Sequence, residues 1–422
     1  MTRLFSLEYA RSLDAADPLR RFREAFLFPE PAGPGPVVYF TGNSLGLQPR
    51  GVRKAVEQEL DDWARYGVEG HFKAATPWVS YHEVLIPPLA ELIGAREAEV
   101  TAMNALTVNL HLLMASFYRP TPNRYKIVID PNAFPSDRYA VASQLRFHGY
   151  DPDEALMIAP ADEQGRLDHP ALYRLLEEEG PRIAMLLMGG VNYYTGQVLD
   201  MPTITRRAHA QGIMVGFDLA HAAGNIPLAL HDWGVDFAAW CSYKYLNGGP
   251  GGVAGAFVHQ KHLGRADIPR FEGWWGHDKA SRFRMPERFV PLPTVEAWQL
   301  SNVPILLMAA LRPSLALFQQ AGMERLRAKS LMMWDYFYAL LKDIGDPRLE
   351  VITPLEPEAH GCQLSLRIRE VGHPAYEALT RADVYVDWRS PDVIRAAPVP
   401  LYNSFEDIYH FAERLQRILK SL

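Results

Sequence analysis

Short apolar runs alternate with longer amphipathic stretches between about residues 100 and 260. The runs are nearly continuous in valine, isoleucine, leucine, methionine and phenylalanine, which is typical of strands covered on both faces. We expect strands at Lys126–Asp130, Ala155–Ala159, Ile183–Met188, Ile213–Asp218, Phe237–Ser242 and Gly255–His259. Helical patterns lie between them at Ser136–Phe147, His169–Glu179 and Thr203–Gln211. This alternation predicts the α/β class, with a mostly parallel central sheet and helices on both sides.

The two ends of the chain follow other patterns. Gly51–Arg65 is amphipathic, and Pro304–Asp343 predicts one or more long helices. Gly361–Arg369 alternates like a half-buried strand, and Phe405–Leu419 predicts a closing helix. We therefore expect a large domain at 66–310 and a smaller α+β domain at 311–422, to which the N-terminal segment 1–65 contributes.

Composition narrows the possible functions. The 422 residues include 43 Lys+Arg and 49 Asp+Glu, so the formal net charge of −6 gives no basis for nonspecific nucleic-acid binding. The two cysteines, Cys241 and Cys362, exclude a disulfide framework and a thiolate zinc site, so we expect no metal and a cytoplasmic location. The N-terminus lacks the apolar core of a signal peptide. Arg312 and Pro313 interrupt the longest apolar stretch, which is shorter than the ~20 residues that span a bilayer.

Lys244 directly follows an apolar strand in AAWCSYKYLNGGPGG (238–252), between Tyr243 and Tyr245. An isolated lysine is usually a surface residue. In these aromatic surroundings, desolvation would favour the uncharged amine, which is the form that attacks an aldehyde to make a Schiff base. The following glycines permit close approach of a ligand. They do not predict a dinucleotide-binding turn, because the next segment has the pattern of a strand and not of a helix.

Asp218 ends a strand in VGFDLAHAAGN (215–225), and His221 lies three residues further on. Ligands of open α/β sheets bind at this carboxyl edge, although a helix-capping aspartate beside an ordinary histidine would give the same pattern. Asp218 precedes Lys244 by only about one strand and one connection, so both side chains can reach the same crevice. A carboxylate and a nucleophilic lysine there suit pyridoxal phosphate, whose ring nitrogen the carboxylate keeps protonated.

Two further segments offer groups that such a cofactor needs. In NALTVNLHLLM (104–114), Thr107 is expected to cap a helix whose free N–H groups would bind a phosphate; a cap without a ligand is the alternative. In AFPSDRY (133–139), Phe134 could stack on a flat ring and Asp137 could hydrogen-bond to cofactor or substrate. The alternative for the second segment is a turn that leads into a helix.

Together these segments resemble the fold-type I pyridoxal-phosphate enzymes of the class V aminotransferase-like superfamily, and more narrowly the kynureninase family. The likeness covers most of the chain, and DLAHAxGN, WCSYKYLN and APVPLYNSF are specific to the family rather than to the fold. Other matching segments are YFTGNSLGLQP (39–49), YGVEGHF (66–72), VNYYTGQ (191–197), GWWGH (273–277), QLSNVPILL (299–307) and IRAAPVPLYNS (394–404). At Gly189 some relatives carry a serine near the cofactor phosphate, and a backbone N–H or Tyr194 is expected to replace that contact.

The resemblance implies a role for each matching residue. Lys244 would hold pyridoxal 5′-phosphate and act as acid and base at Cα, with Asp218 on the ring nitrogen and His221 beside it. The other cofactor-binding residues would be Leu106, Thr107, Phe134, Asp137, Tyr194, Tyr243, Trp274 and Asn302. The substrate-binding residues would be Ser44, His71, Ser301, Asn302 and Arg395, the last holding the α-carboxylate. Because Trp274 and Asn302 reach the site from the neighbouring subunit in this family, the resemblance also implies a homodimer.

By themselves some of these residues fit structural roles equally well. Arg395 could equally form a structural ion pair, His71 could be a loop histidine, and GWWGH could be a core or interface aromatic cluster. Their functional roles depend on the resemblance.

The implied activity is the hydrolysis of L-kynurenine, or of its 3-hydroxy form, to the corresponding anthranilate and L-alanine in tryptophan catabolism and NAD biosynthesis. Tyr243 is the expected proton donor. The alternatives are a cysteine desulfurase, an aminotransferase, or a catalytically silent binding protein of the same fold. A desulfurase needs a mobile nucleophilic cysteine, and neither cysteine here has a suitable position. A silent binding protein has no need for Lys244, Asp218 and Arg395 together.

Overall fold

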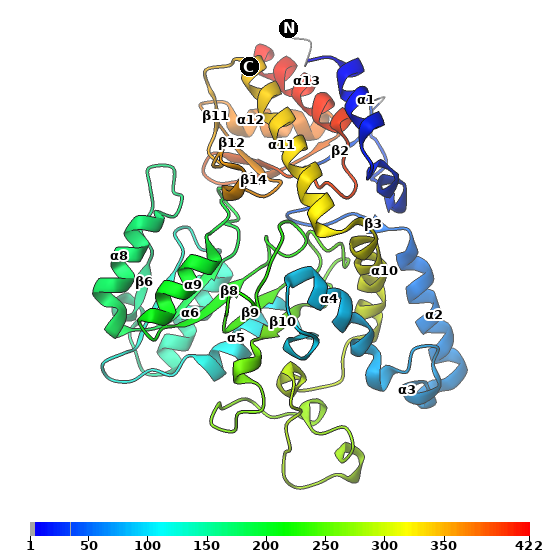
Figure 1. The fold of residues 1–422 in the computed structure, drawn as a ribbon. Helices are drawn as coiled ribbons and strands as arrows, with labels where there is room; N and C mark the ends of the chain where they lie inside the picture. Colours follow the sequence, from blue (N-terminus) through cyan, green and yellow to red (C-terminus); the bar gives the residue numbers. More distant parts are fainter. Residues whose placement is uncertain (1–4, 34) are drawn as a thin grey trace.

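A seven-stranded sheet forms the centre of the larger of two domains in the computed structural model, which describes residues 5–33 and 35–422 (Figure 1). In order across the sheet the strands are β4 (Val100–Ala102), β10 (Gly255–Val258), β9 (Phe237–Trp240), β8 (Met214–Asp218), β7 (Ile183–Gly189), β5 (Lys126–Ile129) and β6 (Leu156–Ile158). The strands from β9 to β6 are parallel, whereas β10 is antiparallel to both of its neighbours. The predicted mostly parallel sheet is confirmed, and the short strand β4 is an addition to it.

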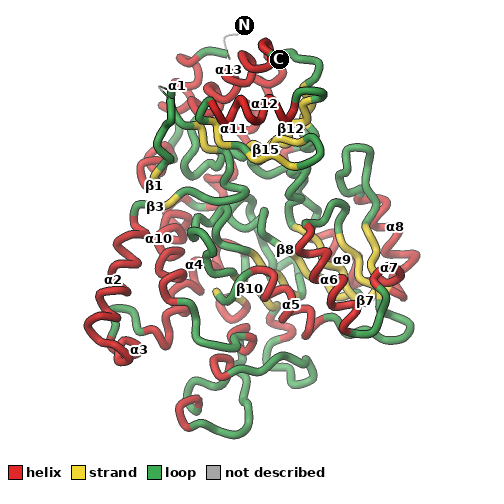
Figure 2. The backbone as a smooth tube through the Cα atoms, turned by 180° about the vertical axis from the view of Figure 1, so that it is seen from behind, coloured by secondary structure: helices red, strands yellow, loops and turns green. Residues whose placement is uncertain are grey.

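Helices cover both faces of this sheet, as Figure 2 shows from behind. They are α5 (Leu106–Phe117) and α6 (Pro135–Phe147) on one face, and α8 (His169–Glu179) and α9 (Met201–Ala210) on the other. Successive residues of β7 point to opposite faces: Met185 and Leu187 pack in the cluster that contains α5 and α6, and Leu186 and Met188 in the cluster that contains α8 and α9. Burial on both sides explains why these strands are continuous apolar runs.

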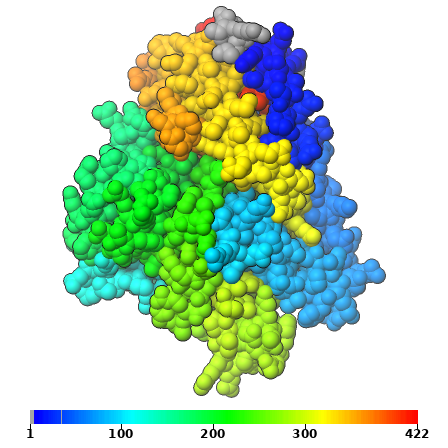
Figure 3. Space-filling model, viewed as in Figure 1, coloured from blue at the N-terminus to red at the C-terminus, as the bar shows by residue number. Residues whose placement is uncertain are grey.

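A second group of helices packs beside β4 and carries the chain toward the smaller domain. It contains α2 (Gly51–Tyr66), α3 (Gly70–Lys73), α4 (Ile86–Ile93) and α10 (Ile305–Ala321). The segment between β10 and α10 projects from the large domain as a lobe at the bottom of the molecule (Figure 3). Pro304–Asp343, expected to form one or more helices, forms α10 and α11 (Met323–Ile344), which are separated at Gly322. No helix in the described ranges is both long and apolar enough to cross a membrane.

The smaller domain contains an antiparallel sheet covered by helices. Its strands, in order, are β11 (Leu349–Val351), β12 (Leu364–Ile368), β15 (Val393–Ala396) and β14 (Asp387–Arg389). Its helices are α11, α12 (Gly372–Arg381) and α13 (Phe405–Ser421). Outside this domain, the chain also forms the short helix α7 (Pro152–Ala155) and the two-stranded pair of β1 (Phe26–Leu27) and β3 (Gln48–Pro49). Because α10 packs against α2 and α4, we propose that the domain boundary lies near Gly322 and not at residue 310.

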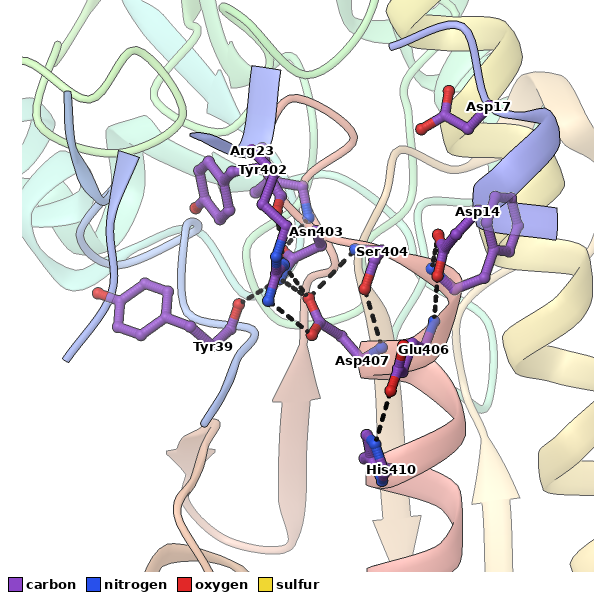
Figure 4. Close-up of polar contacts among 12 residues, drawn as sticks. Asp14, Asp17, Arg23, Tyr39, Tyr402, Asn403, Ser404, Glu406, Asp407 and His410 are labelled. Carbon is purple, nitrogen blue, oxygen red and sulfur yellow. Dashed lines mark hydrogen bonds and ion pairs between the residues drawn. The ribbon is translucent and has the colours of Figure 1, made fainter. Parts of the chain in front are cut away.

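The first part of the N-terminal segment, as far as β2, packs on the smaller domain. Helix α1 (Leu7–Ala16) packs on α13, and β2 (Val38–Tyr39) pairs in parallel with β13 (Val384–Tyr385). Figure 4 shows the polar side of this contact: the Asp14 carboxylate accepts hydrogen bonds from the backbone N–H groups of Phe405, at 2.8 Å, and Glu406, at 2.9 Å. Arg23 also pairs with Asp407. An aspartate distant in sequence thus binds free N–H groups at the N-terminus of α13, in addition to the N-cap Ser404, whose hydroxyl accepts from the N–H of Asp407.

Candidate active site

A cavity of about 400 Å³ lies at the carboxyl edge of the central sheet. Because parallel strands place their carboxyl ends at one edge, residues at the ends of β5, β7 and β8 and just after β9 meet there, namely Asp130, Gly189, Asp218 and Lys244. The small domain closes the cavity with Arg389 and Arg395. Of the residues expected at the site, the cavity is lined by Ser44, Leu106, Thr107, Phe134, Asp137, Asp218, His221, Tyr243, Lys244 and Arg395.

The amine of Lys244 lies between the imidazole of His221 and the aromatic rings of Phe134 and Tyr243. Its Nζ atom is 3.1 Å from Nε2 of His221 and 5.9 Å from the ring centre of Phe134. Burial, reinforced by the charge of Lys244, places the pKa of His221 well below its usual value. His221 is therefore neutral, and its Nε2 can accept a hydrogen bond from the amine. Its other ring nitrogen, Nδ1, is buried and has no hydrogen-bond partner within residues 5–33 and 35–422.

The loop that contains Gly46 packs directly against the loop that contains Lys244. The backbone N–H of Gly46 donates to the carbonyl of Tyr243 at 2.8 Å. A Cβ atom at position 46 would overlap the carbonyl oxygen of Lys244, so only glycine permits this close approach. The motif YFTGNSLGLQP thus positions the lysine, and its residues Asn43 and Ser44 also line the cavity.

Three buried carboxylates lie within the cavity wall. Burial raises the pKa of Asp218, and burial together with the charge of Asp218 raises the pKa of Asp137 well above its usual value. Asp137 is thus the partner that keeps its proton and donates it in a hydrogen bond to Asp218, while Oδ1 of Asp218 also accepts from the N–H of Ala220 at 2.7 Å. Burial raises the pKa of Asp130 to about 6. A cationic group bound beside Asp218 would be stabilised strongly.

The N-termini of two helices also line the cavity. Helix α5 begins at Leu106 after an extended Ala105, and neither α5 nor α6 has a side-chain cap. The prediction that Thr107 is the N-cap was wrong, because Thr107 lies in the first turn of α5. Its hydroxyl is 2.9 Å from that of Ser136 in the first turn of α6. Uncapped N–H groups and two hydroxyls form a corner that favours an anion.

Tyr194 does not line the cavity, contrary to what the resemblance implied. Its hydroxyl donates to Asp392 of the small domain at 2.9 Å, and the neighbouring Tyr193 lines the cavity instead. The backbone N–H of Gly189 is also engaged, since it donates to Asp130 at 3.2 Å. Both groups that were expected to replace the serine of relatives thus already donate to carboxylates of the protein. The hydroxyls of Thr107 and Ser136 are the better candidates for that contact with the phosphate.

Arg395 is almost fully buried, and its contacts fit both a structural ion pair and a carboxylate-binding role. It forms an ion pair with Asp387, its Nη1 donates to the carbonyl of Tyr193 at 2.9 Å, and its Nη2 lies 3.1 Å from Oγ of Ser44. Burial lowers the pKa of Arg395 and Asp387 raises it, so the guanidinium remains charged. This charge in the cavity wall can bind a carboxylate.

Besides Tyr194, four other expected residues do not line this cavity: His71, Trp274, Ser301 and Asn302. His71 packs against Trp78, and its Nδ1 is 3.0 Å from the carbonyl of Val68. The indole of Trp274 is on the projecting lobe and is 39% exposed, and Ser301 and Asn302 are exposed.

Sequence reasoning missed Asp130, Ser136, Tyr193 and Arg389, which line the cavity. Asp130 and Ser136 had a usable signal, because Asp130 ends a predicted strand and Ser136 lies between Phe134 and Asp137. Tyr193 and Arg389 lie in a loop and on a small-domain strand, and nothing in the local pattern places them at the edge of the large sheet.

Two clusters of histidine and glutamate lie outside the cavity. In Glu99, His231 and His259, the carboxylate already accepts hydrogen bonds from His231 and from the backbone N–H of Gln260. In the cluster of His82, Glu83 and Glu296, the ammonium of Lys279 already occupies the position of a cation. In both clusters the buried glutamate is thus already bound by groups of the protein itself.

The chain is similar over nearly its whole length to proteins named kynureninase. A family model described as the kynureninase C-terminal domain matches residues 326–415. Kynureninase from Myxococcus xanthus (strain DK1622) is 52% identical over 412 residues, which cover 97% of each chain. Kynureninase from Xanthomonas euvesicatoria pv. vesicatoria (strain 85-10) is 53% identical over 420 residues, which cover 99% of each chain.

Solved structures with the same fold are more distant in sequence. A mutant of C-DES with glycine covalently linked to its PLP cofactor has a TM-score of 0.78 at 20% identity, covering 93% of this chain and 98% of its own. The cysteine desulfurase CsdA from Escherichia coli has a TM-score of 0.77 at 19% identity, covering 96% of this chain and 99% of its own. At these identities the likeness concerns the fold alone, and it confirms the predicted fold type.

Proposed function

The chain belongs to the kynureninase family, and we propose that it is a pyridoxal-phosphate enzyme that hydrolyses L-kynurenine to anthranilate and L-alanine. One observation carries the proposal: Lys244, Asp218 and Arg395 lie in the walls of the same cavity, at the edge of the sheet. A lysine and an aspartate on opposite sides of the molecule could not serve one cofactor. We further propose a cytoplasmic enzyme, because both cysteines are free thiols.

The cavity fits pyridoxal phosphate group by group. Lys244 offers an amine to the aldehyde, Asp218 a carboxylate to the ring nitrogen, and Phe134 an aromatic face to the ring. The uncapped start of α5, with Thr107 and Ser136, offers N–H and hydroxyl donors to the phosphate. Bound there, the group supplies an electrophilic aldehyde carbon and a protonated ring that accepts electrons released at the substrate.

The protein's own residues would bind the substrate and move its protons. Arg395 binds the α-carboxylate and so holds the substrate Cα near Lys244, whose Nζ removes the Cα proton. Asp218 would keep the ring nitrogen protonated; burial raises the pKa of Asp218, and the charge of Lys244 opposes that rise. His221 stays neutral and accepts a hydrogen bond from Nζ.

Cleavage of the Cβ–Cγ bond needs a water and a proton. The water adds to the side-chain carbonyl carbon Cγ, which leaves as the carboxylate of anthranilate, and Cβ takes up a proton to become the methyl group of alanine. Tyr243 is the proposed donor of that proton, because burial raises the pKa of its hydroxyl and the hydroxyl therefore stays protonated at neutral pH. Water, kynurenine and the two products balance without any further reactant.

We include a homodimer in the proposal, in which Trp274, Asn302, His71 and Ser301 complete the site of the neighbouring subunit. Exposed apolar side chains gather around Trp274: its ring centre lies 5.4 Å from that of Phe283, which lies 5.9 Å from that of Phe72. All three rings are more than a third exposed, and they link the projecting lobe to α3. An aromatic patch of this kind is typical of a protein interface.

The main alternative, a cysteine desulfurase, lacks support in this cavity. Neither Cys241 nor Cys362 lines it, and both are buried. Burial raises the pKa of both thiols, so neither is a ready thiolate nucleophile.

Fluorescence of anthranilate tests the proposal. The wild-type protein, loaded with pyridoxal phosphate and given L-kynurenine, is expected to release anthranilate and alanine in equal amounts. Lys244→Ala, loaded in the same way, is expected to release none. A loaded wild-type sample that forms no anthranilate would overturn the proposed function.

A further inference from the structure

Two arginines of the small domain line the cavity, and the proposed function uses only one of them. Arg389, like Arg395, is part of the cavity wall. The Nε atoms of both are buried, and neither has a hydrogen-bond partner in the parts of the chain that the structure describes. Buried polar groups in proteins are almost always hydrogen-bonded. Two guanidinium donors without acceptors in one cavity therefore point to an anionic ligand.

Strand pairing brings these arginines to the same face of the small sheet. In the antiparallel pair of β14 and β15, Asp387 lies directly opposite Arg395. Arg389 is two residues after Asp387 on β14, so both side chains leave the strand on the same face. Asp387, Arg389 and Arg395 thus form one charged cluster facing the large domain, where β14 lies in Figure 1.

Asp387 is the centre of this cluster. Its Oδ2 atom accepts hydrogen bonds from Arg395, from Ser44 Oγ and, at 3.0 Å, from Nη2 of Arg389. One carboxylate against two guanidinium groups leaves a net charge of about +1 on the cluster, which matches a single carboxylate of a substrate.

Arg395 cannot easily hold a carboxylate alone. A two-pronged grip on a carboxylate uses two parallel N–H donors of one guanidinium. In Arg395 the Nη1 atom is engaged by the carbonyl of Tyr193, and Nη2 by Asp387 and Ser44. Its Nε is the nitrogen without a partner in the described residues. A second donor is needed to hold both carboxylate oxygens, and Arg389 is the other cation of the cluster.

We propose that Arg389 is a second substrate-binding residue for the α-carboxylate, which it shares with Arg395, and that Asp387 positions both guanidinium groups. The inference rests on the function proposed above, since it assigns a carboxylate of that substrate to this wall. The proposal also explains why the short strand β14 carries a charged residue, Arg389, that lines the cavity.

The test compares ligands with and without the carboxylate. In Arg389→Ala, KM for L-kynurenine is expected to rise about 10- to 100-fold, the range that one charge-assisted hydrogen bond gives, with a smaller change in kcat. The inhibition constant of the decarboxylated analogue, which keeps the amine and the aromatic ketone, is expected to stay within about twofold of wild type. Arg389→Lys keeps the charge but lacks the planar guanidinium, and its KM is expected to lie between those of wild type and Arg389→Ala.

Arg369→Ala is the matched control, because this arginine is also in the small domain and is exposed, with its partner Glu350 outside the cavity. Its KM is expected to equal that of wild type. An unchanged KM in Arg389→Ala, in an otherwise active enzyme, would overturn the assignment. So would an equal loss of affinity for the analogue or for pyridoxal phosphate, because Arg389 would then act on the cofactor or the fold. An inactive wild type would instead refute the proposed function.

Discussion

Replacing Asp218 by asparagine tests the electrostatic part of the proposed chemistry. The amide is nearly the same size as the carboxylate, and its oxygen can still accept the hydrogen bond from the N–H of Ala220. The change therefore removes one negative charge and little else. Without that charge the ring nitrogen of the cofactor loses its proton more easily and accepts electrons less well.

The size of the effect follows from burial. Asp218 is buried, so its attraction for a cation about 4 Å away is worth about 4 kcal/mol at an effective dielectric constant of about 20. If most of this acts on the transition state, kcat falls on the order of 10³-fold. Asp137 limits the loss, because its raised pKa is partly caused by Asp218, and it ionises more easily once that charge is gone. The double variant, with Asp137→Asn added, is expected to be slower still.

The assay is kcat for anthranilate release at saturating pyridoxal phosphate, together with the melting temperature of the cofactor-free protein. Folding raises the pKa of Asp218, so its contribution to stability is full at low pH and is lost as pH rises. The neutral asparagine avoids that loss, and the cofactor-free variant is expected to melt at the same temperature as wild type or higher near neutral pH. A kcat within tenfold of wild type, in a variant that binds the cofactor, would show that the charge of Asp218 is not needed for the chemistry.

Three further predictions concern other parts of the molecule. Because burial raises the pKa of Asp130 to about 6, its stabilising contribution is full below its unfolded pKa and is lost as pH rises through about 6; the melting temperature of the cofactor-free wild type should fall more between about pH 5 and about pH 7 than that of Asp130→Asn, and equal slopes would contradict this. Asp14→Ala removes two hydrogen bonds to the first turn of α13, while the cap made by Ser404 remains, and should lower the free energy of unfolding by about 1 kcal/mol in urea titration, so an unchanged midpoint would show that the Asp14 contacts are dispensable. Trp274→Ala and Lys244→Ala should each be poorly active as homodimers, yet the two proteins unfolded and refolded together should recover activity if Trp274 serves the neighbouring site, whereas no recovery would place Trp274 elsewhere.

Much of the large domain could be predicted because its strands are buried on both faces. Continuous apolar runs such as Ile183–Met188, bounded by polar residues and too short for a helix, favour buried strands, and the carboxyl ends of those strands locate Asp218 and the approach to Lys244. The three-residue strand β4 was too short to leave such a pattern. Local signals thus located the lysine and its aspartate, which are the two residues on which the cofactor assignment depends.

Residues in irregular segments were harder to place. Tyr193 and Tyr194 are adjacent, yet one lines the cavity and the other bonds to Asp392, because the side-chain oxygen of Asn192 accepts from the N–H groups of Tyr194 and Thr195 and so fixes the loop. No periodicity predicts such a turn. Arg389 reaches the cavity only through the packing of the small domain on the large one, which no local sequence pattern encodes.

The proposed chemistry depends above all on the attachment of pyridoxal phosphate to Lys244. Borohydride reduction of the loaded protein turns a lysine–aldehyde imine into a stable amine, and mass mapping of the digested peptides then identifies the modified lysine. We expect the modification on the peptide that contains SYKYLNGG, at Lys244, and no modification of the Lys244→Ala variant. Modification of a different lysine, with Lys244 intact and unlabelled, would contradict the proposed role of Lys244.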